Sequence, residues 1–196
     1  MPIINAREDQ EKYYLYFGRL SEEKGILTLI KAIENVDANL YIVGSGPLKE
    51  EIERYVSSRK LHNIKLLGFK RGQELIDIVG NARAVVLPSE WYENGPYSAI
   101  EALQVGRPII GANIGGIPEL IRNNGKLFTS GKIEELAECI NIFEKMPKIQ
   151  YEQMKKYSFD IFEEFYTPNE HYNKLMKIYK KALTNEKLMS SKCPIR

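Results

Sequence analysis

The feature that most constrains this chain is a regular alternation of short apolar segments with segments of helical periodicity. The apolar runs cover residues 13–17, 39–43, 64–67, 84–87, 108–111 and 125–128, and glycine-containing turns follow most of them. Helices are expected over 24–35, up to about 58, over 74–81, after 96 and over 133–143. Strands that alternate with helices are typical of a parallel sheet with helices on both faces. We therefore expect an α/β fold: a Rossmann-like, doubly wound parallel sheet of about six strands, followed by C-terminal helices.

The two ends of the chain differ from this central pattern. Residues 1–12 are polar and are expected to form a flexible N-terminal segment, and residues 184–196 lack periodicity and are expected to form a loose tail. After residue 145 the pattern is wholly helical, and one face of the final helix carries apolar side chains. They are Tyr172, Leu175, Met176, Tyr179 and Ala182. We expect this face to pack on the core of a single domain over residues 13–183, with a neighbouring domain as the alternative.

Composition and charge exclude several classes of protein. Hydrophobic residues make up 43% of the 196 residues and charged residues 28%, which is ordinary for a folded globular domain. With 28 basic and 26 acidic residues the net charge is +2, so no broad basic surface is available for a nucleic-acid backbone. No apolar run approaches the roughly 18 residues of a membrane span, and the first residues are too polar for a signal peptide. We therefore expect no nucleic-acid partner and no transmembrane segment.

The cysteines and histidines do not suggest a metal site. Cys139 and Cys193 are the only cysteines, and their spacing indicates neither a disulfide framework nor a set of metal ligands. His62 and His171 lie far in sequence from the polar loops considered next. We expect no bound metal, and this cysteine usage fits a reducing, cytoplasmic setting.

The most informative loop follows the fourth apolar run. Residues 88–106 read PSEWYENGPYSAIEALQVG, and Pro96 is expected to occupy the first turn of a helix. A helix N-terminus at the carboxyl end of a buried strand offers backbone N–H groups and a positive dipole end to an anion. Glu93 on the loop and Glu101 in the helix can meet only the neutral hydroxyls of such a ligand. We therefore expect amides here to bind a phosphate and carboxylates to bind sugar hydroxyls.

Three further loops leave strands at the same predicted edge of the sheet. After the first strand, Arg19 and Lys24 combine a planar guanidinium with a compact ammonium, a pairing suited to a diphosphate. After the second, residues 44–46 begin like a dinucleotide fingerprint but the third glycine is absent, which argues against a nicotinamide cofactor. After the third, the backbone of residues 68–70 is placed to meet a base edge or to form a plain turn. Taken alone, such charges and glycine turns are more often ordinary surface features.

Taken together, these loops resemble the C-terminal, nucleotide-sugar-binding domain of GT-B fold glycosyltransferases, in particular the retaining family 4 (group 1). The resemblance covers roughly residues 13–183. Its motifs are Phe17-Gly18-Arg19-Leu20 with Lys24-Gly25, Val43-Gly44-Ser45-Gly46-Pro47, Leu67-Gly68-Phe69, and Pro88-Ser89 followed by Glu93, Glu101-Ala102 and Gly106-Arg107-Pro108-Ile109-Ile110. The order and spacing of these motifs agree with the family.

The resemblance implies a role for each polar loop residue. Arg19 and Lys24 would bind the donor diphosphate and stabilise the charge that grows on it as the glycosidic bond breaks. Glu93 would contact hydroxyls of the donor sugar, and Glu101 would accept hydrogen bonds from the ribose. The implied catalytic set is Arg19, Lys24 and Glu93; Gly95, Tyr97 and Ser98 would join the diphosphate site, Asn94 and Gly95 the sugar site, and Gly68, Phe69 and Lys70 the base site.

The resemblance also implies the reaction. Such enzymes transfer a sugar, here of hexose type, from a UDP, GDP or ADP donor with retention at the anomeric carbon, and they need no cofactor beyond the donor. The chain contains no Asp-x-Asp sequence, in agreement with GT-B enzymes that bind the donor without a metal. One departure concerns residues 94–96: many relatives have Gly-Phe-Gly where this chain has Asn-Gly-Pro. Pro96 removes one amide donor from the loop.

In this family an N-terminal domain binds the acceptor and completes the cleft, and the sequence shows no counterpart of it. We therefore expect the chain to be a donor-binding half that is inactive by itself. It would be cytoplasmic, and any association with a membrane would come through the missing domain. The alternatives are a stand-alone nucleotide-sugar-binding module, a regulatory subunit, and half of a GT-B nucleotide-sugar epimerase.

Overall fold

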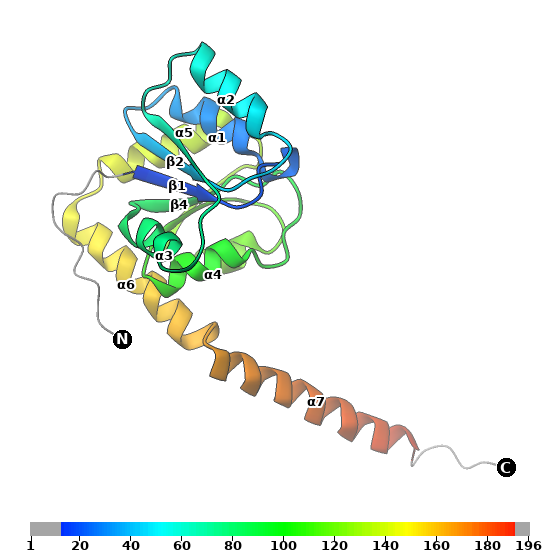
Figure 1. Ribbon diagram of the computed structural model, residues 1–196. Coiled ribbons are helices and arrows are strands. Elements are labelled where there is room, and N and C mark those ends of the chain that lie inside the picture. Colours follow the sequence, from blue (N-terminus) through cyan, green and yellow to red (C-terminus); the bar gives the residue numbers. More distant parts are fainter. Residues whose placement is uncertain (1–12, 191–196) are drawn as a thin grey trace. The chain divides into compact units, whose positions relative to one another are not determined.

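The computed structural model describes residues 13–190, so the expected N-terminal segment 1–12 and the last residues of the expected tail lie outside the described residues. Six parallel strands form a sheet in the order β3-β2-β1-β4-β5-β6 (Figure 1). They are β1 (Tyr13–Phe17), β2 (Asn39–Val43), β3 (Ile64–Gly68), β4 (Ala84–Leu87), β5 (Ile109–Ala112) and β6 (Gly125–Phe128). The expected Rossmann-like, doubly wound sheet is therefore confirmed.

Helices cover both faces of this sheet. They are α1 (Ile26–Ile33), α2 (Lys49–Ser58), α3 (Gly72–Asn81), α4 (Tyr97–Gln104) and α5 (Ile133–Glu144), with 3-10 turns η1 (Glu22–Lys24) and η2 (Ile117–Leu120). Figure 1 shows α1, α2 and α5 on one face and α3 and α4 on the other. Every residue of β1, β4 and β5 is buried, because central parallel strands between two helical layers have no face toward water. Three of the six apolar runs of the sequence are these fully buried strands, and the other three form β2, β3 and β6, which are partly exposed.

The helix expected over residues 24–35 is shorter than predicted. Gly25 adopts a left-handed conformation with φ of 64°, which ends η1 and separates it from α1. A Cβ atom at Gly25 would lie 1.9 Å from the carbonyl oxygen of Pro88, so the backbones of two loops touch at this glycine. Lys24 consequently lies at the end of a short turn in the loop after β1 and not in the helix.

The C-terminal part of the chain is helical further than expected. Helix α6 covers Lys148–Phe165 and α7 covers Pro168–Ser190, so the prediction of a loose tail from residue 184 is wrong as far as residue 190. The chain divides into two compact units, one ending at Phe159 and the other beginning at Asp160, and the expected domain of residues 13–183 spans both. Within the second unit Tyr172 and Tyr179 are exposed. The sequence predicted that the apolar face of α7 is buried, and within this unit it is not.

A buried arginine closes the amino end of the sheet. Arg83, which precedes β4, is only 7% exposed, and its Nε lies 3.3 Å from Glu144 Oε1. The same carboxylate oxygen accepts a hydrogen bond from the Tyr14 hydroxyl at 2.7 Å, and the guanidinium donates to the carbonyl of Phe143 and lies over the ring of Tyr151. Burial, and then the contact with Glu144, raises the pKa of Tyr14. These contacts hold the end of α5 and the start of α6 against the sheet.

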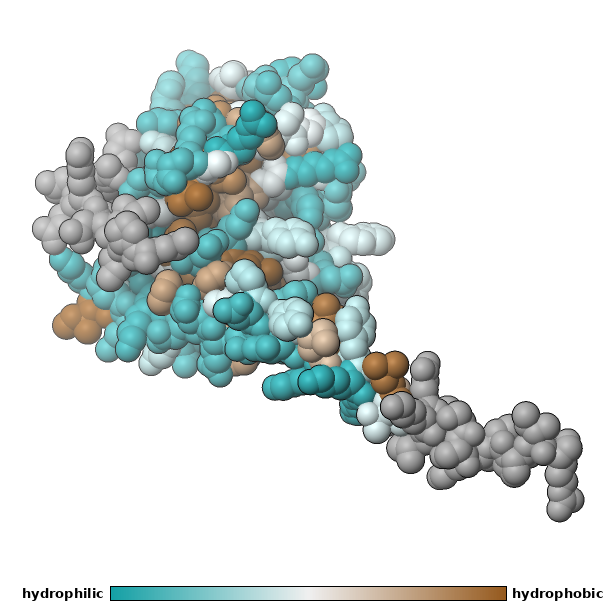
Figure 2. Space-filling view, turned by 60° about the horizontal axis from the view of Figure 1, so that its bottom comes forward, coloured by the Kyte–Doolittle hydropathy of each residue, from teal (hydrophilic) through white to brown (hydrophobic). Residues whose placement is uncertain are grey.

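On the face drawn in Figure 2 hydrophilic residues predominate, and hydrophobic residues lie in separate small areas. Most apolar residues of the first unit are buried. None of the helices within residues 13–190 has the length and hydropathy needed to cross a membrane.

The pairing of β5 with β6 gives a first prediction. A Cβ atom at Gly125 would lie 1.9 Å from the carbonyl oxygen of Ile109, so Gly125→Ala should force the strands apart and destabilise the fold by roughly 1–3 kcal/mol. Gly80→Ala is the matched control, because no atom lies within 4 Å of that Cβ position in α3, and it should stabilise the fold by roughly 0.5–1 kcal/mol. Urea unfolding followed by circular dichroism measures both changes. Equal stability of the two variants would contradict the described strand packing.

Candidate functional site

The strand order reverses between β1 and β4, which are neighbours in the sheet although two strands separate them in sequence. In a doubly wound sheet, ligands bind beside the carboxyl ends of the strands at such a reversal, where the flanking connections diverge to opposite faces. The loop after β1 carries Arg19 and Lys24, and the loop after β4 carries Glu93 and leads into α4. The topology therefore brings two of the sequence-predicted loops to one edge.

The side chains of Lys24 and Glu93 meet at this reversal. Lys24 Nζ and Glu93 Oε1 form an ion pair between residues 69 positions apart, and the two side chains are 29% and 17% exposed. The hydroxyl of Ser89 donates a second hydrogen bond to the same carboxylate oxygen at 3.0 Å. A partly shielded pair of this kind is stronger than an exposed surface pair, because water screens it less. The structure thus brings Lys24, which is predicted to bind the diphosphate, into contact with Glu93, which is predicted to bind the sugar.

Hydrogen bonds fix the loop after β4 against the loop after β1. The backbone N–H of Glu90 donates to the carbonyl of Glu23 at 2.9 Å, and the Thr28 hydroxyl donates to Glu90 Oε1 at 2.5 Å. On the other side, the Ser130 hydroxyl donates to the carbonyl of Ser89 at 2.9 Å. These contacts hold the backbone on either side of the Lys24–Glu93 pair in place.

Two glycines after β5 pack closely against the backbone of the loop that carries Glu93. The N–H of Gly116 donates to the carbonyl of Glu93 at 2.6 Å, and a Cβ atom at Gly116 would lie 2.5 Å from the carbonyl oxygen of Asn94. Gly115 has φ of 58°, and a Cβ there would lie 2.6 Å from the backbone nitrogen and oxygen of Glu93. Sequence reasoning missed this supporting role, and the adjacent glycine pair directly after an apolar strand is the signal that could have indicated it.

Arg19 lies on the exposed part of the loop after β1. Its backbone carbonyl accepts a hydrogen bond from the Tyr16 hydroxyl at 2.6 Å, and the next residue, Leu20, donates its N–H to the carbonyl of Ser45 at 3.0 Å. Burial, and then the negative charge of Glu93, raises the pKa of Tyr16, so this hydroxyl stays protonated and continues to donate. Among residues 13–190 the guanidinium itself has no hydrogen bond or ion pair, which leaves its donors available to a ligand.

Helix α4 begins one residue later than expected. Pro96 is the N-cap, with φ of −65° and ψ of 126°, and does not occupy the first turn; Tyr97 is the first helical residue. The N–H groups of Tyr97 and Ser98 belong to the first turn, where no preceding carbonyl of the helix can accept them. The exposed Gly95 lies just before the cap, with no atom within 4 Å of its Cβ position. The end of α4 therefore retains amide donors although Pro96 supplies none.

Glu101 lies in the second turn of α4, on the element that follows the Glu93 loop. The surrounding protein atoms raise the pKa of its carboxyl by desolvation, although the residue as a whole remains exposed. No hydrogen bond or ion pair to the carboxylate occurs within the described range 13–190. Unlike Glu93, Glu101 makes no contact with Lys24, and it keeps its acceptor positions for another group.

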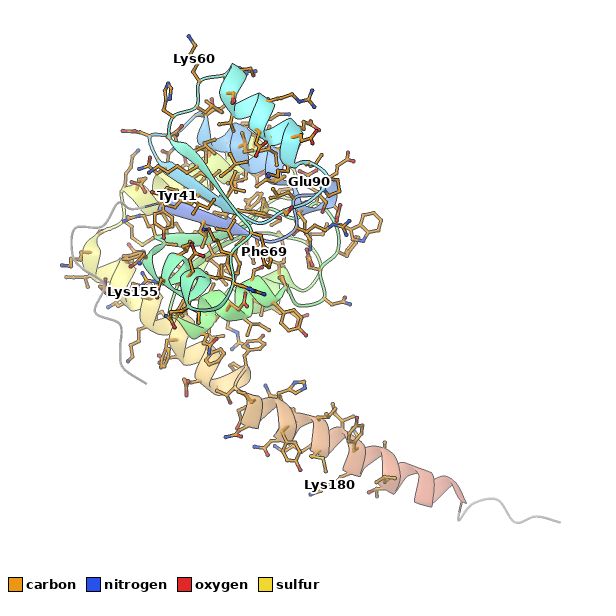
Figure 3. All side chains as sticks on the ribbon, in the orientation of Figure 1. Tyr41, Lys60, Phe69, Glu90, Lys155 and Lys180 are labelled. Atoms are coloured by element: carbon orange, nitrogen blue, oxygen red, sulfur yellow. The ribbon has the colours of Figure 1, made fainter. Side chains whose placement is uncertain are left out.

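The predicted base-binding segment ends β3, the edge strand that pairs with β2. Gly68 has φ of 68°, and its carbonyl accepts a hydrogen bond from the N–H of Gly44 at 2.9 Å. Phe69 is 71% exposed, and Figure 3 shows it, like Glu90, toward the end of the sheet to which the strands point. Lys70 is engaged with Glu74, with Nζ 2.5 Å from Oε1. These residues share the edge with Lys24 and Glu93 but do not contact that pair.

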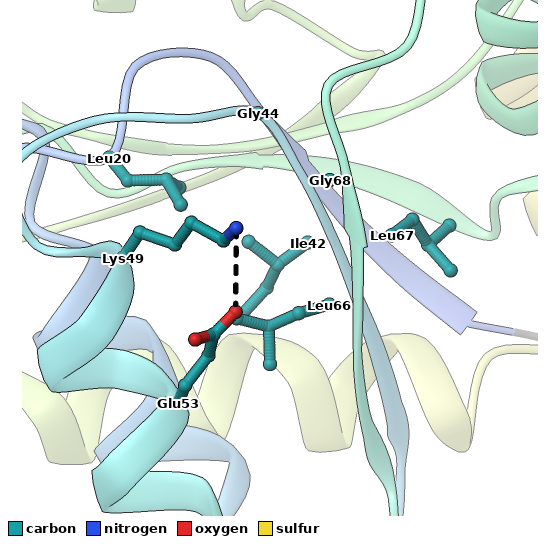
Figure 4. A pocket seen from close by; sticks show the side chains of 8 residues that line it. All are labelled: Leu20, Ile42, Gly44, Lys49, Glu53, Leu66, Leu67 and Gly68. Carbon is teal, nitrogen blue, oxygen red and sulfur yellow. Dashed lines mark ion pairs between the residues drawn. The ribbon is translucent and has the colours of Figure 1, made fainter.

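A small pocket lies beside this edge, between α2 and the strands β2 and β3 (Figure 4). Its volume is about 220 Å³. It is lined by Leu20, Ile42, Gly44, Lys49, Glu53, Leu66, Leu67 and Gly68. Lys49 Nζ lies 3.7 Å from Glu53 Oε1, so the two charges face each other. The pocket offers an apolar floor and no unpaired charge for a reaction.

Comparison with solved structures identifies the fold. HepE from Anabaena, solved in complex with UDP, matches with a TM-score of 0.79 and 22% identity over 87% of this chain and 49% of that chain. The catalytic domain of cholesterol-alpha-glucosyltransferase from Helicobacter pylori matches with a TM-score of 0.67 and 22% identity over 76% of this chain and 96% of that chain. The fold is therefore the Rossmann-like domain of GT-B glycosyltransferases.

The sequence itself places the chain in a family. Residues 2–160 match the glycosyl transferases group 1, and the chain belongs to this family. An uncharacterised glycosyltransferase from Methanocaldococcus jannaschii is 36% identical over 59% of this chain and 31% of its own length. The alpha-D-kanosaminyltransferase of Streptomyces kanamyceticus is 26% identical over 67% of this chain and 36% of its own length. The chain thus spans about a third of the length of these relatives.

The glycine support of the Glu93 loop gives a second prediction. Gly115→Ala should destabilise the fold by roughly 1–3 kcal/mol, because it combines a left-handed backbone with a clash against Glu93. The control is Gly95→Ala on the Glu93 loop itself. A Cβ atom at this position meets no neighbouring atom, so the variant should change stability by less than about 0.5 kcal/mol. Urea unfolding gives the stabilities, and amide hydrogen exchange should show faster exchange at Glu90 in the Gly115 variant. Unchanged exchange and stability in that variant would refute the supporting role.

Proposed function

We propose that this chain binds a nucleoside-diphosphate sugar and forms the donor side of a retaining glycosyltransferase. The observation that carries the proposal is the meeting of Lys24 and Glu93 at the reversal of strand order, next to the amide donors that begin α4. A cation and amides suit the diphosphate, and carboxylates suit hydroxyls. A nucleotide sugar carries both kinds of group in one molecule.

The diphosphate would lie between the loop after β1 and the start of α4. Arg19 supplies guanidinium donors that no described residue occupies, Lys24 supplies a half-buried ammonium, and Gly95, Tyr97 and Ser98 supply backbone N–H groups. Preorganised donors aimed at an oxygen that gains negative charge lower the barrier of bond cleavage. The same groups would therefore bind the donor and stabilise the departing diphosphate.

The hydroxyls of the donor would be bound by the two glutamates. Glu101 accepts from the ribose one turn into α4, while Glu93, together with Asn94 and the backbone of Gly95, contacts the sugar. Gly68, Phe69 and Lys70 border the base at the end of β3, where Phe69 offers an exposed ring. An aromatic face and backbone groups fit a planar base. HepE, of the same fold, was solved with UDP-glucose, so UDP-glucose is the first donor to test.

In the transfer, the bond between the anomeric carbon and the diphosphate oxygen breaks, and the acceptor oxygen forms a bond to the same carbon from the same face. The acceptor proton passes to the departing diphosphate, which activates the acceptor. Lys24 and Arg19 stabilise that diphosphate, and Glu93 positions the sugar. The product is a hexoside with the configuration of the donor, and no step requires a metal ion.

The acceptor would be held by a further domain. The chain covers 31% and 39% of the two Methanocaldococcus jannaschii relatives, which leaves most of their length for other parts. An N-terminal GT-B domain placed over the carboxyl edge of this sheet would exclude water from the anomeric carbon. The competing interpretations are a stand-alone binding module, a regulatory subunit and half of an epimerase.

A ligand panel tests the donor site. UDP-, GDP- and ADP-sugars are compared by thermal shift, because a ligand that binds only the folded state raises its melting temperature. For the donor that binds, Arg19→Ala and Lys24→Ala should each weaken binding by roughly 1.5–3 kcal/mol, the scale of a hydrogen bond to a charged group, as measured by calorimetry. Lys31→Ala, an exposed lysine at the far end of α1, is the control and should leave affinity unchanged. Unaltered affinity in both site variants would refute the phosphate assignment.

The role of a partner domain is tested by adding it separately. The 196-residue chain alone should bind the donor and transfer no sugar, since it forms only the donor side of the proposed cleft, and transfer should appear when an acceptor-binding chain is supplied in trans. A radiolabelled donor sugar measures transfer, and chromatography of free UDP-sugars detects epimerisation. Robust transfer by the chain alone would contradict the prediction, and conversion of the free donor to its epimer would favour the epimerase.

A further inference from the structure

We infer that the Lys24–Glu93 pair makes this site select the sugar-bearing donor over the free nucleoside diphosphate that transfer leaves behind. The inference rests on the proposed function, because it assigns the terminal phosphate of the donor to Lys24. It adds a role that the proposal does not contain: the carboxylate of Glu93 acts on the charge of the ligand as well as on its hydroxyls.

The starting point is the ion pair that Lys24 forms with Glu93. Its Nζ contacts Glu93 Oε1, and Ser89 donates to the same oxygen at 3.0 Å. Glu93 is only 17% exposed, and its backbone is fixed by the bond from Gly116 at 2.6 Å. The carboxylate therefore cannot easily leave when a phosphate approaches Lys24. Any phosphate that binds the ammonium must also lie close to this negative charge.

The two possible ligands differ in charge at that position. The terminal phosphate of a free nucleoside diphosphate is linked through one bridging oxygen only and, like a phosphate monoester, has a second pKa near 6, so it carries a charge of about −1.5 to −2 at pH 7. In a nucleotide sugar the same phosphorus is linked on both sides, by an anhydride and by the ester to the sugar, and carries roughly one negative charge. The repulsion from Glu93 is therefore stronger for the free diphosphate. Because the carboxylate is partly shielded from water, this difference is not fully screened.

The two ligands also differ in what they offer to Glu93. A nucleotide sugar presents hydroxyls, which donate hydrogen bonds to a carboxylate, whereas the free diphosphate presents only acceptor oxygens at the same place. A buried acceptor that loses its donors is costly, and a ligand that replaces them is favoured. Charge and hydrogen bonding thus act in the same direction.

This selection has a consequence for the order of events in catalysis. When the sugar has left and the proton taken from the acceptor has passed on to water, the terminal phosphate carries more negative charge next to Glu93, and the carboxylate loses its hydroxyl donors. Lys24 can then pair with Glu93 again, as it does in the structure. The pair would thereby promote release of the product and limit its inhibition of the enzyme.

The test compares Glu93→Gln with the unchanged chain, using UDP against UDP-glucose and GDP against GDP-mannose in calorimetry at pH 7.5. Removing the charge should strengthen binding of the free diphosphate about tenfold and weaken binding of the nucleotide sugar, since the amide still accepts hydrogen bonds, but more weakly. A structural defect would weaken both ligands. At pH 5.5 the gain for the free diphosphate should shrink, because its terminal phosphate is then mostly singly charged.

Two variants keep the test specific. Glu90→Gln removes the same charge from the same loop, but Glu90 bonds to Thr28 and not to Lys24, so selectivity should stay as in the unchanged chain. Glu93→Asp keeps the charge while moving it by one carbon, and it should retain discrimination against free diphosphate. Urea unfolding confirms that each variant is folded.

The outcomes are distinguishable from those that test the proposed function. If the unchanged chain bound neither pair of ligands, the proposed function would fail and this inference with it. If the chain bound both members of a pair, but Glu93→Gln left their affinity ratio unchanged or shifted it toward the nucleotide sugar, the inference alone would be overturned. A shift toward the free diphosphate in Glu93→Gln and not in Glu90→Gln supports it.

Discussion

The site depends on the adjacency of two strands that are far apart in sequence. Because β1 lies beside β4, the connection after β1 crosses to one face of the sheet and the connection after β4 crosses to the other. Both connections begin at the carboxyl edge of the sheet and carry polar residues there. No other neighbouring pair of strands in the described sheet combines a reversal of order with charges on both loops. This single reversal brings the polar residues of the motifs after β1 and β4 close together in space.

Charge balance is the second constraint on this edge of the sheet. Arg19, Lys24 and the positive end of α4 all attract anions, and cations held close to one another repel. Glu93 offsets part of this positive field by pairing with Lys24, while Arg19 remains exposed to water. The site therefore carries one neutralised and one available cation. That asymmetry distinguishes the two residues, although the sequence shows them simply as two basic positions in one loop.

Much of this arrangement could be predicted from the sequence, because the deciding signals are local. The apolar runs at 13–17 and 84–87 are strands with the expected bounds, since a central parallel strand must be apolar on both faces. The run at 125–128 also has the expected bounds, although β6 lies at the edge of the sheet and is partly exposed. The motifs also indicated the loops that carry Lys24 and Glu93, although their direct contact was not predicted. The break at Gly25 and the support from residues 115–116 were missed. Both depend on close approach to backbone atoms distant in sequence, which no local pattern records.

The end of the chain shows the opposite error. The residues after 183 lack an amphipathic pattern, which suggested a loose tail, yet α7 continues to Ser190. Residues of good helix propensity, such as the Glu-Lys-Leu-Met run before that serine, can extend a helix without an apolar face. The ligand-binding roles given to all the site residues, Lys24 and Glu93 included, remain predictions, because they concern a ligand and not the fold.

The backbone contact between the glycines after β5 and the Glu93 loop has a consequence for the thermodynamics of binding. A segment that is fixed before its ligand arrives loses little conformational entropy on association, so more of the interaction energy appears as affinity. The loop from 88 to 96 is held on both sides by hydrogen bonds that involve no ligand. Ordering on binding would then be confined to the long side chains at the rim of the site, chiefly that of Arg19 on the loop after β1.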